Sequence, residues 1–181
     1  MPLENEQDLI RCCQRGEHRA FEALYHHYER PMLSLAYRML GSQEEAEDAL
    51  QDAFLKLYRK IGQYRFDAAF NTWLYRIVAN TCYDRLKKRK RATPVPLDTV
   101  GEIAVKDDAR MRVQIQAAID SLPPKMKASF VLYAQEGRTQ RDIAEILGTK
   151  EGTVKAHVFR AKERLREILA PQMRGLNPDE V

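Results

Sequence analysis

The feature that most constrains the fold is a helical spacing of apolar residues that runs through most of the chain and is interrupted once, between Ala92 and Asp108. On either side, apolar residues recur every three or four positions, as on a helix with one buried face. Within the interruption, Pro94 and Pro96 prevent a helix, and the charge changes from basic to acidic. No pattern of useful length for a strand occurs. The sequence therefore predicts an all-α protein of two small helical domains joined by a flexible linker. The predicted parts are a first domain at residues 1–91, a linker at 92–109, a second domain at 110–171 and a tail at 172–181.

Composition narrows the class of protein. Hydrophobic residues make up 44% and charged residues 31% of the 181 positions, which fits a folded chain rather than a disordered one. No apolar run approaches the roughly 20 residues of a membrane span, and the acidic N-terminal residues lack the pattern of a signal peptide. Cys12, Cys13 and Cys82 do not amount to a disulfide framework. Cys12 and Cys13 belong to no motif, and we expect them to be small core residues rather than thiol sensors. A cytoplasmic protein is predicted.

Four helices are expected in the first domain. Gly16 and Gly41 are placed to end the first two, and Pro31 can kink or split the second. Ser42-Gln-Glu-Glu45 has the form of a capping box that opens the third. The fourth opens near Asn71, after a loop at 62–69.

The fourth helix carries two faces. Its apolar face is predicted from Trp73, Leu74, Ile77 and Val78. The opposite side is polar, because Arg76, Asn80, Tyr83 and Lys87 lie four, three and four positions apart.

This polar side adjoins a basic run and an aromatic loop. Six basic residues fall between Arg85 and Arg91, and Tyr64, Phe66 and Phe70 lie in or beside the preceding loop. Cations hold phosphates, aromatic rings stack on unpaired bases, and an amide reads a base edge. The combination predicts a site for a strand that is being opened. The alternatives are a solvated helix end for the basic run and core packing for Trp73 and Phe70.

The second domain contains a helix-turn-helix pattern. Helices are expected at 111–121 and 125–135, and a short third helix follows the capping box Thr139-Gln-Arg-Asp142. Gly148 permits the turn, and Val154 anchors a long amphipathic helix that exposes basic residues. Such a helix fits the major groove of DNA. The alternative is a solvated basic helix in an ordinary bundle, since the net charge of +4 is weak evidence for nucleic acid by itself.

The third helix is expected to expose an acidic side formed by Glu44, Asp48, Gln51 and Asp52. Solubility explains such a side by default, and acids near a helix N-terminus are favourable in any case. The sharper interpretation is a docking surface for a basic protein partner.

These motifs resemble the extracytoplasmic-function sigma factors, which belong to the sigma-70 superfamily. Region 2 of that family is resembled by two stretches, Glu47-Asp48-Ala-Leu-Gln51-Asp52-Ala-Phe54-Leu-Lys and Phe70-Asn-Thr72-Trp73-Leu74-Tyr-Arg76-Ile77-Val-Ala-Asn80-Thr-Cys-Tyr-Asp84-Arg85. Region 4 is resembled by Leu122-Pro-Pro, Asp142-Ile-Ala144-Glu-Ile-Leu-Gly148, Gly152-Thr153-Val154-Lys155, Arg160-Ala161-Lys and Leu165-Arg166. The likeness covers roughly residues 8–169.

The resemblance implies a transcription initiation factor that binds core RNA polymerase and directs it to promoters. In such factors the first domain grips the polymerase clamp and recognises and opens the −10 element. The second domain binds the −35 element and the polymerase flap. An inhibitory anti-sigma partner is implied as well, whereas no cofactor, metal or membrane insertion is expected.

Carried over by position, the resemblance implies three sets of contacts. Core polymerase would meet Asp48, Gln51, Asp52 and Leu55. The −10 DNA would meet Tyr64, Phe66, Phe70, Trp73, Arg76, Asn80, Tyr83, Arg85, Lys87 and Lys88. The −35 DNA would meet Thr139, Thr153, Lys155, His157, Arg160, Lys162 and Arg164.

Two other classes of protein remain open. A helix-turn-helix regulator with an N-terminal dimerisation domain would explain the second domain and leave the basic and aromatic fourth helix unexplained. An enzyme is disfavoured, because the histidines and cysteines lack metal-ligand spacing. Neither a phosphate-binding glycine loop nor a nucleophile elbow occurs.

Overall fold

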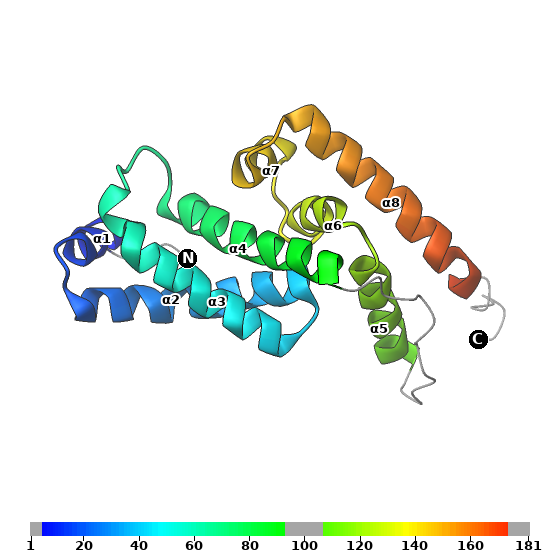
Figure 1. The fold of residues 1–181 in the computed structure, drawn as a ribbon, viewed down its shortest axis with the longest axis horizontal. Helices are drawn as coiled ribbons and strands as arrows, with labels where there is room; N and C mark the ends of the chain where they lie inside the picture. Colours follow the sequence, from blue (N-terminus) through cyan, green and yellow to red (C-terminus); the bar gives the residue numbers. More distant parts are fainter. Residues whose placement is uncertain (1–4, 93–106, 174–181) are drawn as a thin grey trace. The chain divides into compact units, whose positions relative to one another are not determined.

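The computed structural model describes residues 5–92 and 107–173, and within them every regular element is helical (Figure 1). The elements are α1 (Glu6–Gln14), α2 (His18–Leu40), α3 (Gln43–Lys60), η1 (Ile61–Gln63), α4 (Phe70–Ala92), α5 (Asp107–Asp120), α6 (Pro124–Phe130), η2 (Val131–Gln135), α7 (Gln140–Leu147) and α8 (Glu151–Met173). They fall into two compact units. The predicted all-α class is confirmed. Most of the predicted linker, residues 93–106, lies outside the described part of the chain.

The N-terminal unit is built on α2, which packs against both α1 and α3. Leu24 and Leu35 on α2 and Leu57 on α3 are completely buried, as their helical spacing predicts. The predicted end of α2 is confirmed, because Gly41 adopts a left-handed φ of 81° and its amide donates to the carbonyl of Tyr37. Pro31 lies within α2 on its exposed side without ending the helix.

At the start of α3, the serine hydroxyl of the predicted capping box makes its expected hydrogen bond. Ser42 has an extended backbone, and its Oγ accepts a hydrogen bond of 3.4 Å from the amide of Glu45. Along α3, half of the residues on the buried stripe are alanines, so the helix can approach α2 closely. This stripe consists of Ala46, Ala49, Leu50, Ala53, Phe54 and Leu57.

The apolar face of α4 differs in part from the prediction. Leu74 and Val78 are fully buried as expected, whereas Trp73 and Ile77 are only half-buried. The buried stripe instead includes Tyr75, Ala79 and Cys82. The core therefore lies on a neighbouring side of the helix, and Trp73 is left at its edge.

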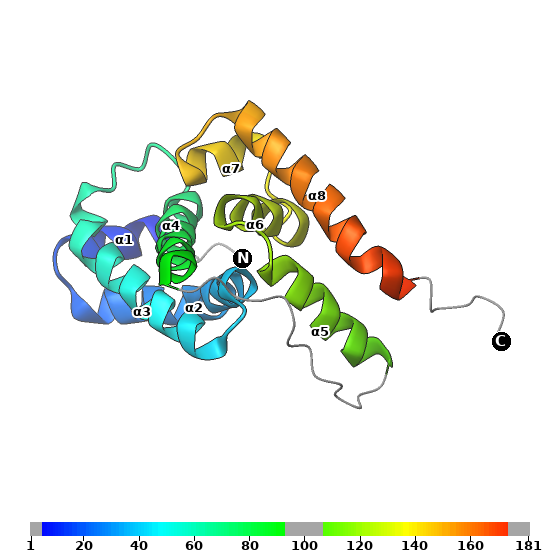
Figure 2. The ribbon, with the colours of Figure 1, turned by 45° about the vertical axis from the view of Figure 1, so that its right-hand side comes forward.

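The C-terminal unit contains α5, α6, η2, the first part of α7 up to Ala144, and α8, and α6 packs against α8 (Figure 2). Helix α5 begins at Asp107, four residues before the predicted start at Met111. The helix expected at 125–135 is divided, because α6 gives way to the wider π turn η2 after Phe130. Val154, Val158, Ala161 and Leu165 of α8 are buried at the predicted helical spacing.

A buried ion pair that the pattern of the sequence did not predict links α5 to α6. The Lys127 side chain is only 1% exposed, and its Nζ lies 2.6 Å from a carboxylate oxygen of Asp120. The same oxygen accepts a hydrogen bond from Gln116. A buried ammonium group needs such a partner, because without one its desolvation would cost several kcal/mol.

Three further features concern the described residues. Cys13 is buried as expected, whereas Cys12 is only half-buried, and Cys82 is buried as well. Burial is the main cause that raises the pKa of Cys13 to about 11. No group of histidine, cysteine or acidic side chains there could hold a metal ion. None of the helices seen in this part of the chain has the length and apolar character needed to cross a membrane.

Candidate nucleic-acid interfaces

An aromatic cluster forms where the loop after η1 meets the start of α4. The ring of Tyr64 is central, with its centroid 4.8 Å from that of Phe66, 5.4 Å from that of Phe70 and 5.1 Å from that of Trp73. Tyr28 on α2 lies behind it, 5.6 Å from Phe70. The structure therefore brings together four of the five aromatic residues that the sequence assigned to one site; the fifth, Tyr83, lies further along α4.

The members of the cluster differ in exposure. Phe70 is 1% exposed and Tyr64 is 9% exposed, so these two rings form the floor of the cluster. Phe66 and Trp73 are half-buried, so part of each side chain stays accessible. Phe70 thus matches the core-packing alternative, and we assign it a supporting role.

The hydroxyl of Tyr64 acts as a donor. It donates to the carbonyl of Ala68 at 2.6 Å, which ties the loop to itself. Burial, followed by the nearby charges of Glu6 and Asp67, raises the pKa of Tyr64. The group therefore keeps its proton at physiological pH.

Helix α1 contributes two residues that the sequence did not assign to this site. The guanidinium carbon of Arg11 lies 5.4 Å from the centroid of the Phe66 ring. The side-chain amide of Gln14 donates to the carbonyls of Ile61 and Tyr64. Pattern alone could not reveal them, because the partners are about 50 positions away in the chain.

The polar side of α4 continues from the cluster. Arg76, Lys87 and Lys88 are exposed, and Asn80 and Tyr83 are half-buried. The spacing predicted for these residues is therefore kept in a continuous helix. The side chains of residues 90–92 lie outside the described set.

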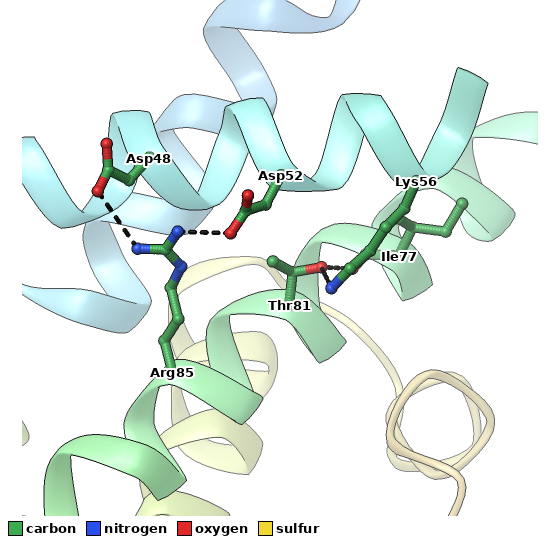
Figure 3. A network of polar contacts seen from close by, with 6 residues as sticks. All are labelled: Asp48, Asp52, Lys56, Ile77, Thr81 and Arg85. Carbon is green, nitrogen blue, oxygen red and sulfur yellow. Dashed lines mark hydrogen bonds and ion pairs between the residues drawn. The ribbon is translucent and has the colours of Figure 1, made fainter. Parts of the chain in front are cut away.

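Arg85 joins the predicted DNA site to the predicted polymerase site (Figure 3). Its Nη2 lies 2.5 Å from Asp52 Oδ2, and its Nη1 lies 3.5 Å from Asp48 Oδ2. The Asp48 and Asp52 side chains remain 62% and 50% exposed. Both carboxylates are thus available to a partner, but they already neutralise a cation of the same chain.

A second polar contact lies beside this ion pair. Lys56 donates to Thr81 Oγ1 at 3.0 Å, and Thr81 donates to the carbonyl of Ile77 at 2.8 Å (Figure 3). The Lys56–Thr81 bond and the Arg85 ion pairs therefore join α3 to α4, whereas the Thr81–Ile77 bond lies within α4.

The exposed side of α3 also carries apolar surface. Leu55 is 51% exposed and Gln51 is exposed, as a docking surface requires. Tyr58, which the sequence did not single out, is 44% exposed and packs edge-on against Phe21 at 5.0 Å. Carboxylates and apolar side chains therefore share one exposed side.

The helix-turn-helix is present in the C-terminal unit. Thr139 and Asp142 cap α7 reciprocally, since Asp142 N donates to Thr139 Oγ1 at 3.1 Å and Thr139 N donates to Asp142 Oδ2 at 3.2 Å. Hydrogen bonding of the Asp142 carboxylate to Thr139, to its side chain first and to its main-chain amide as well, lowers the pKa of Asp142. Gly148 has a φ of 61° in the turn, and the following amide of Thr149 donates to the carbonyl of Ala144. The Thr139 hydroxyl is thus engaged in the cap.

Helix α8 exposes the predicted basic residues. Lys155, Arg160, Lys162 and Arg164 are exposed, while Thr153 and His157 are half-buried. The Lys162 ammonium lies 4.8 Å from the centroid of the Tyr133 ring. Burial, followed by the positive charges of Lys125 and Arg160, lowers the pKa of His157. Phe159 was not among the predicted contacts and is 60% exposed.

Comparison with known proteins gives two family matches in the same order as the two units. Residues 24–92 match Sigma-70 region 2, and residues 112–165 match Sigma-70, region 4. The RNA polymerase sigma-H factor of Pseudomonas aeruginosa is 36% identical, with 94% of this chain and 97% of that protein covered. The ECF RNA polymerase sigma factor SigM of Mycobacterium tuberculosis is 35% identical, with 96% of this chain and 89% of that protein covered. Among solved structures, CnrH in complex with the cytosolic domain of CnrY is similar in fold, with a TM-score of 0.66, 22% identity and coverage of 93% of this chain and 99% of that chain.

Proposed function

Because this chain belongs to the extracytoplasmic-function sigma factors of RNA polymerase, we propose that it directs core polymerase to promoters by binding two separated DNA elements. The N-terminal unit recognises and opens the −10 element, and the C-terminal unit binds the −35 element. It acts in the cytoplasm by binding rather than by catalysis.

One observation carries the proposal for the N-terminal unit. Half-buried Phe66 and Trp73 lie on a floor of buried rings, and the polar side of α4 begins one turn away at Arg76. A base that leaves the duplex needs a stacking surface, a polar group for its edge and a cation for its phosphate. We assign these roles to the rings, to Asn80 and to Arg76 with Lys87 and Lys88. Tyr83 lies on the same side of the helix and completes the site.

The −35 site rests on rigid placement of exposed cations. Lys155 and Arg160 are the main contacts to base edges or phosphates, and Lys162 and Arg164 add phosphate contacts. Thr153 and His157 lie among them, half-buried. Thr139 supports the site by capping α7 and so fixing the turn.

Core polymerase is proposed to bind the exposed side of α3 through Asp48, Gln51, Asp52 and Leu55, and to meet the C-terminal unit through its flap. Carboxylates suit a basic partner, and the exposed Leu55 adds apolar area. Since Arg85 forms ion pairs with two of these carboxylates, a basic partner would compete with it. Polymerase binding would then release Arg85 toward DNA phosphates.

Two weak DNA sites on one chain reinforce each other. Once one unit is bound, the other binds as if intramolecularly, and polymerase fixes the distance between them. The free protein should accordingly bind DNA weakly. The family also leads us to propose an inhibitory anti-sigma partner that covers these surfaces.

The test is transcription in vitro with purified core polymerase and this chain on a genomic library, with the starts mapped. We expect new starts that share two elements at fixed spacing. Asn80→Ala should lower the yield of open complex by about tenfold while core binding stays unchanged, because one base-edge contact is lost. Starts identical to those of polymerase alone would contradict the proposal.

A DNA-binding assay without polymerase distinguishes the proposed function from the second candidate, a helix-turn-helix regulator. Such a regulator would bind a palindromic duplex tightly as a dimer. We expect binding only in the low-affinity range of non-specific contacts, about 10⁻⁴–10⁻⁶ M, and steep weakening with salt.

A further inference from the structure

The last residue of α1 is bonded to the backbone from which the aromatic cluster projects. Gln14 Nε2 donates to the carbonyl of Ile61 at 3.0 Å and to the carbonyl of Tyr64 at 2.9 Å. Both acceptors are main-chain oxygens, so only the nitrogen of the amide can face them, and both of its hydrogens are used. Gln14 therefore fixes the two ends of the short turn η1 with one side chain.

One turn earlier, the same helix contacts the next part of the loop. The Arg11 guanidinium carbon lies 5.4 Å from the centroid of Phe66. Phe66 has a left-handed φ of 61°, which is uncommon for a residue with a bulky side chain and needs support from its surroundings. Arg11 supplies a contact to this ring from outside the loop.

A shift of the Tyr64 backbone would move the whole cluster. Its ring lies within 5.1 Å of both Phe66 and Trp73, and its hydroxyl holds the carbonyl of Ala68. The position of the exposed ring surfaces thus depends on where the backbone of Tyr64 is held. Among the described residues, Gln14 is bonded to that backbone from a different helix.

We propose that Gln14, assisted by Arg11, is a positioning residue that sets the base selectivity of the −10 site by holding the loop at residues 64–69. The inference rests on the proposed function of that loop. It goes beyond the family match, which begins at residue 24 and does not include α1. Helix α1 is then part of the promoter-reading apparatus.

The test compares variants of Gln14 in the full chain bound to core polymerase. Gln14→Met keeps the length and loses both donors, and Gln14→Glu also brings negative charge against two carbonyl oxygens. Gln14→Lys restores a donor for the same carbonyls. Gln7→Glu, an exposed position on the same helix, is the matched control.

Each complex transcribes a pool of templates with a randomised −10 element, and the starts give a base preference at every position. We expect Gln14→Met and Gln14→Glu to reduce the preference at the captured base by about fivefold, as for the loss of about one net hydrogen bond. Gln14→Lys should keep most of the preference, and Gln7→Glu all of it. Core affinity and the thermal midpoint of each variant are measured in parallel.

A purely structural bond would give a different result. If Gln14→Met lowers the thermal midpoint and reduces transcription from all templates by the same factor, the inference is overturned while the proposed function stands. If the unaltered protein neither binds core polymerase nor directs initiation, the proposed function fails first. Should Gln14→Glu not fold, Gln14→Met decides the outcome alone.

Discussion

The two helical units present their candidate DNA-binding residues in different ways. In the N-terminal unit, the candidate site is assembled from α1, the loop after η1 and α4, with ring contacts and bonds to the main chain. In the C-terminal unit, the candidate contacts lie mainly along one helix, and the exposed Lys155, Arg160 and Arg164 project from α8. The first site is a layer of half-exposed rings supported by buried rings, and the second is a set of exposed basic side chains on one helix.

This difference suits the ligand that we propose for each site, an unpaired base for the first and an intact duplex for the second. An unpaired base is small and mobile, so it must be contacted on its face and its edge by groups already in place. An intact duplex is rigid, and a helix that lies in its groove needs only correctly spaced side chains. Loss of packing should therefore harm the first site more than the second.

The largest expected effect is the loss of stability when a ring is removed from the buried floor of the aromatic cluster. Phe70→Ala should destabilise the N-terminal unit by about 3–5 kcal/mol, because a ring that is 1% exposed and contacts Tyr28, Tyr64 and Trp73 leaves a cavity. Phe159→Ala in α8, where the ring is 60% exposed, is the matched control and should change stability by less than about 0.5 kcal/mol. Denaturant unfolding measures the stability of both variants, and equal losses would contradict the inference that the first site depends more on packing than the second.

The next largest effect concerns Lys127, the charged side chain that is buried among the described residues of the C-terminal unit. Asp120→Ala should cost about 3 kcal/mol, because it leaves Lys127, only 1% exposed, without its carboxylate. Lys127→Met removes the buried charge itself and should cost much less, since the remaining Asp120 is 29% exposed and can be hydrated.

Unfolding of the two variants under the same conditions compares them directly. If Lys127→Met destabilises the unit as much as Asp120→Ala does, the ion pair itself adds to the stability of the unit. It would then do more than offset the cost of burying the Lys127 charge. The C-terminal unit would then depend on a polar interaction as much as the aromatic site depends on packing.

A smaller effect is expected at the ion pair that joins α3 to α4. Asp48→Lys should weaken the binding of core polymerase by about tenfold, because a carboxylate on the proposed docking side becomes a cation. Glu47→Lys, also exposed on α3, makes the same change in charge at the adjacent position and should have little effect. A binding titration with purified polymerase measures the affinity of both variants. Equal losses of affinity would mean that the overall charge of α3, and not a contact at Asp48, affects binding.

Local features of the fold could be predicted because their determinants lie close together in the chain. Gly41 ends α2, Ser42 caps α3, and Thr139 with Asp142 caps α7, all through residues within four positions. The exposure of Asp48 and of Lys155 also followed from helical spacing.

Contacts between distant segments could not be predicted in the same way. The bond from Gln14 to Ile61 spans 47 positions, and the ion pair of Arg85 with Asp52 spans 33. Periodicity also misplaced the core side of α4, because the buried sector of a helix depends on the rotation that its neighbours impose. Trp73 consequently lies at the edge of the core, where it can offer a ring to a base.

The smallest expected effect separates two roles for Thr139. Its hydroxyl accepts from the amide of Asp142, so Thr139→Ala should cost about 1 kcal/mol of stability in the C-terminal unit through loss of the cap. Thr139→Asp keeps an acceptor at the cap and should restore that stability.

If Thr139 also lies against a phosphate, the added carboxylate would weaken −35 DNA binding in spite of the restored fold. Promoter binding by the polymerase complex, measured with both variants, distinguishes the roles. We expect Thr139→Asp to bind like the unaltered protein, because the hydroxyl is already engaged within the chain, and this site needs a rigid turn more than an additional contact.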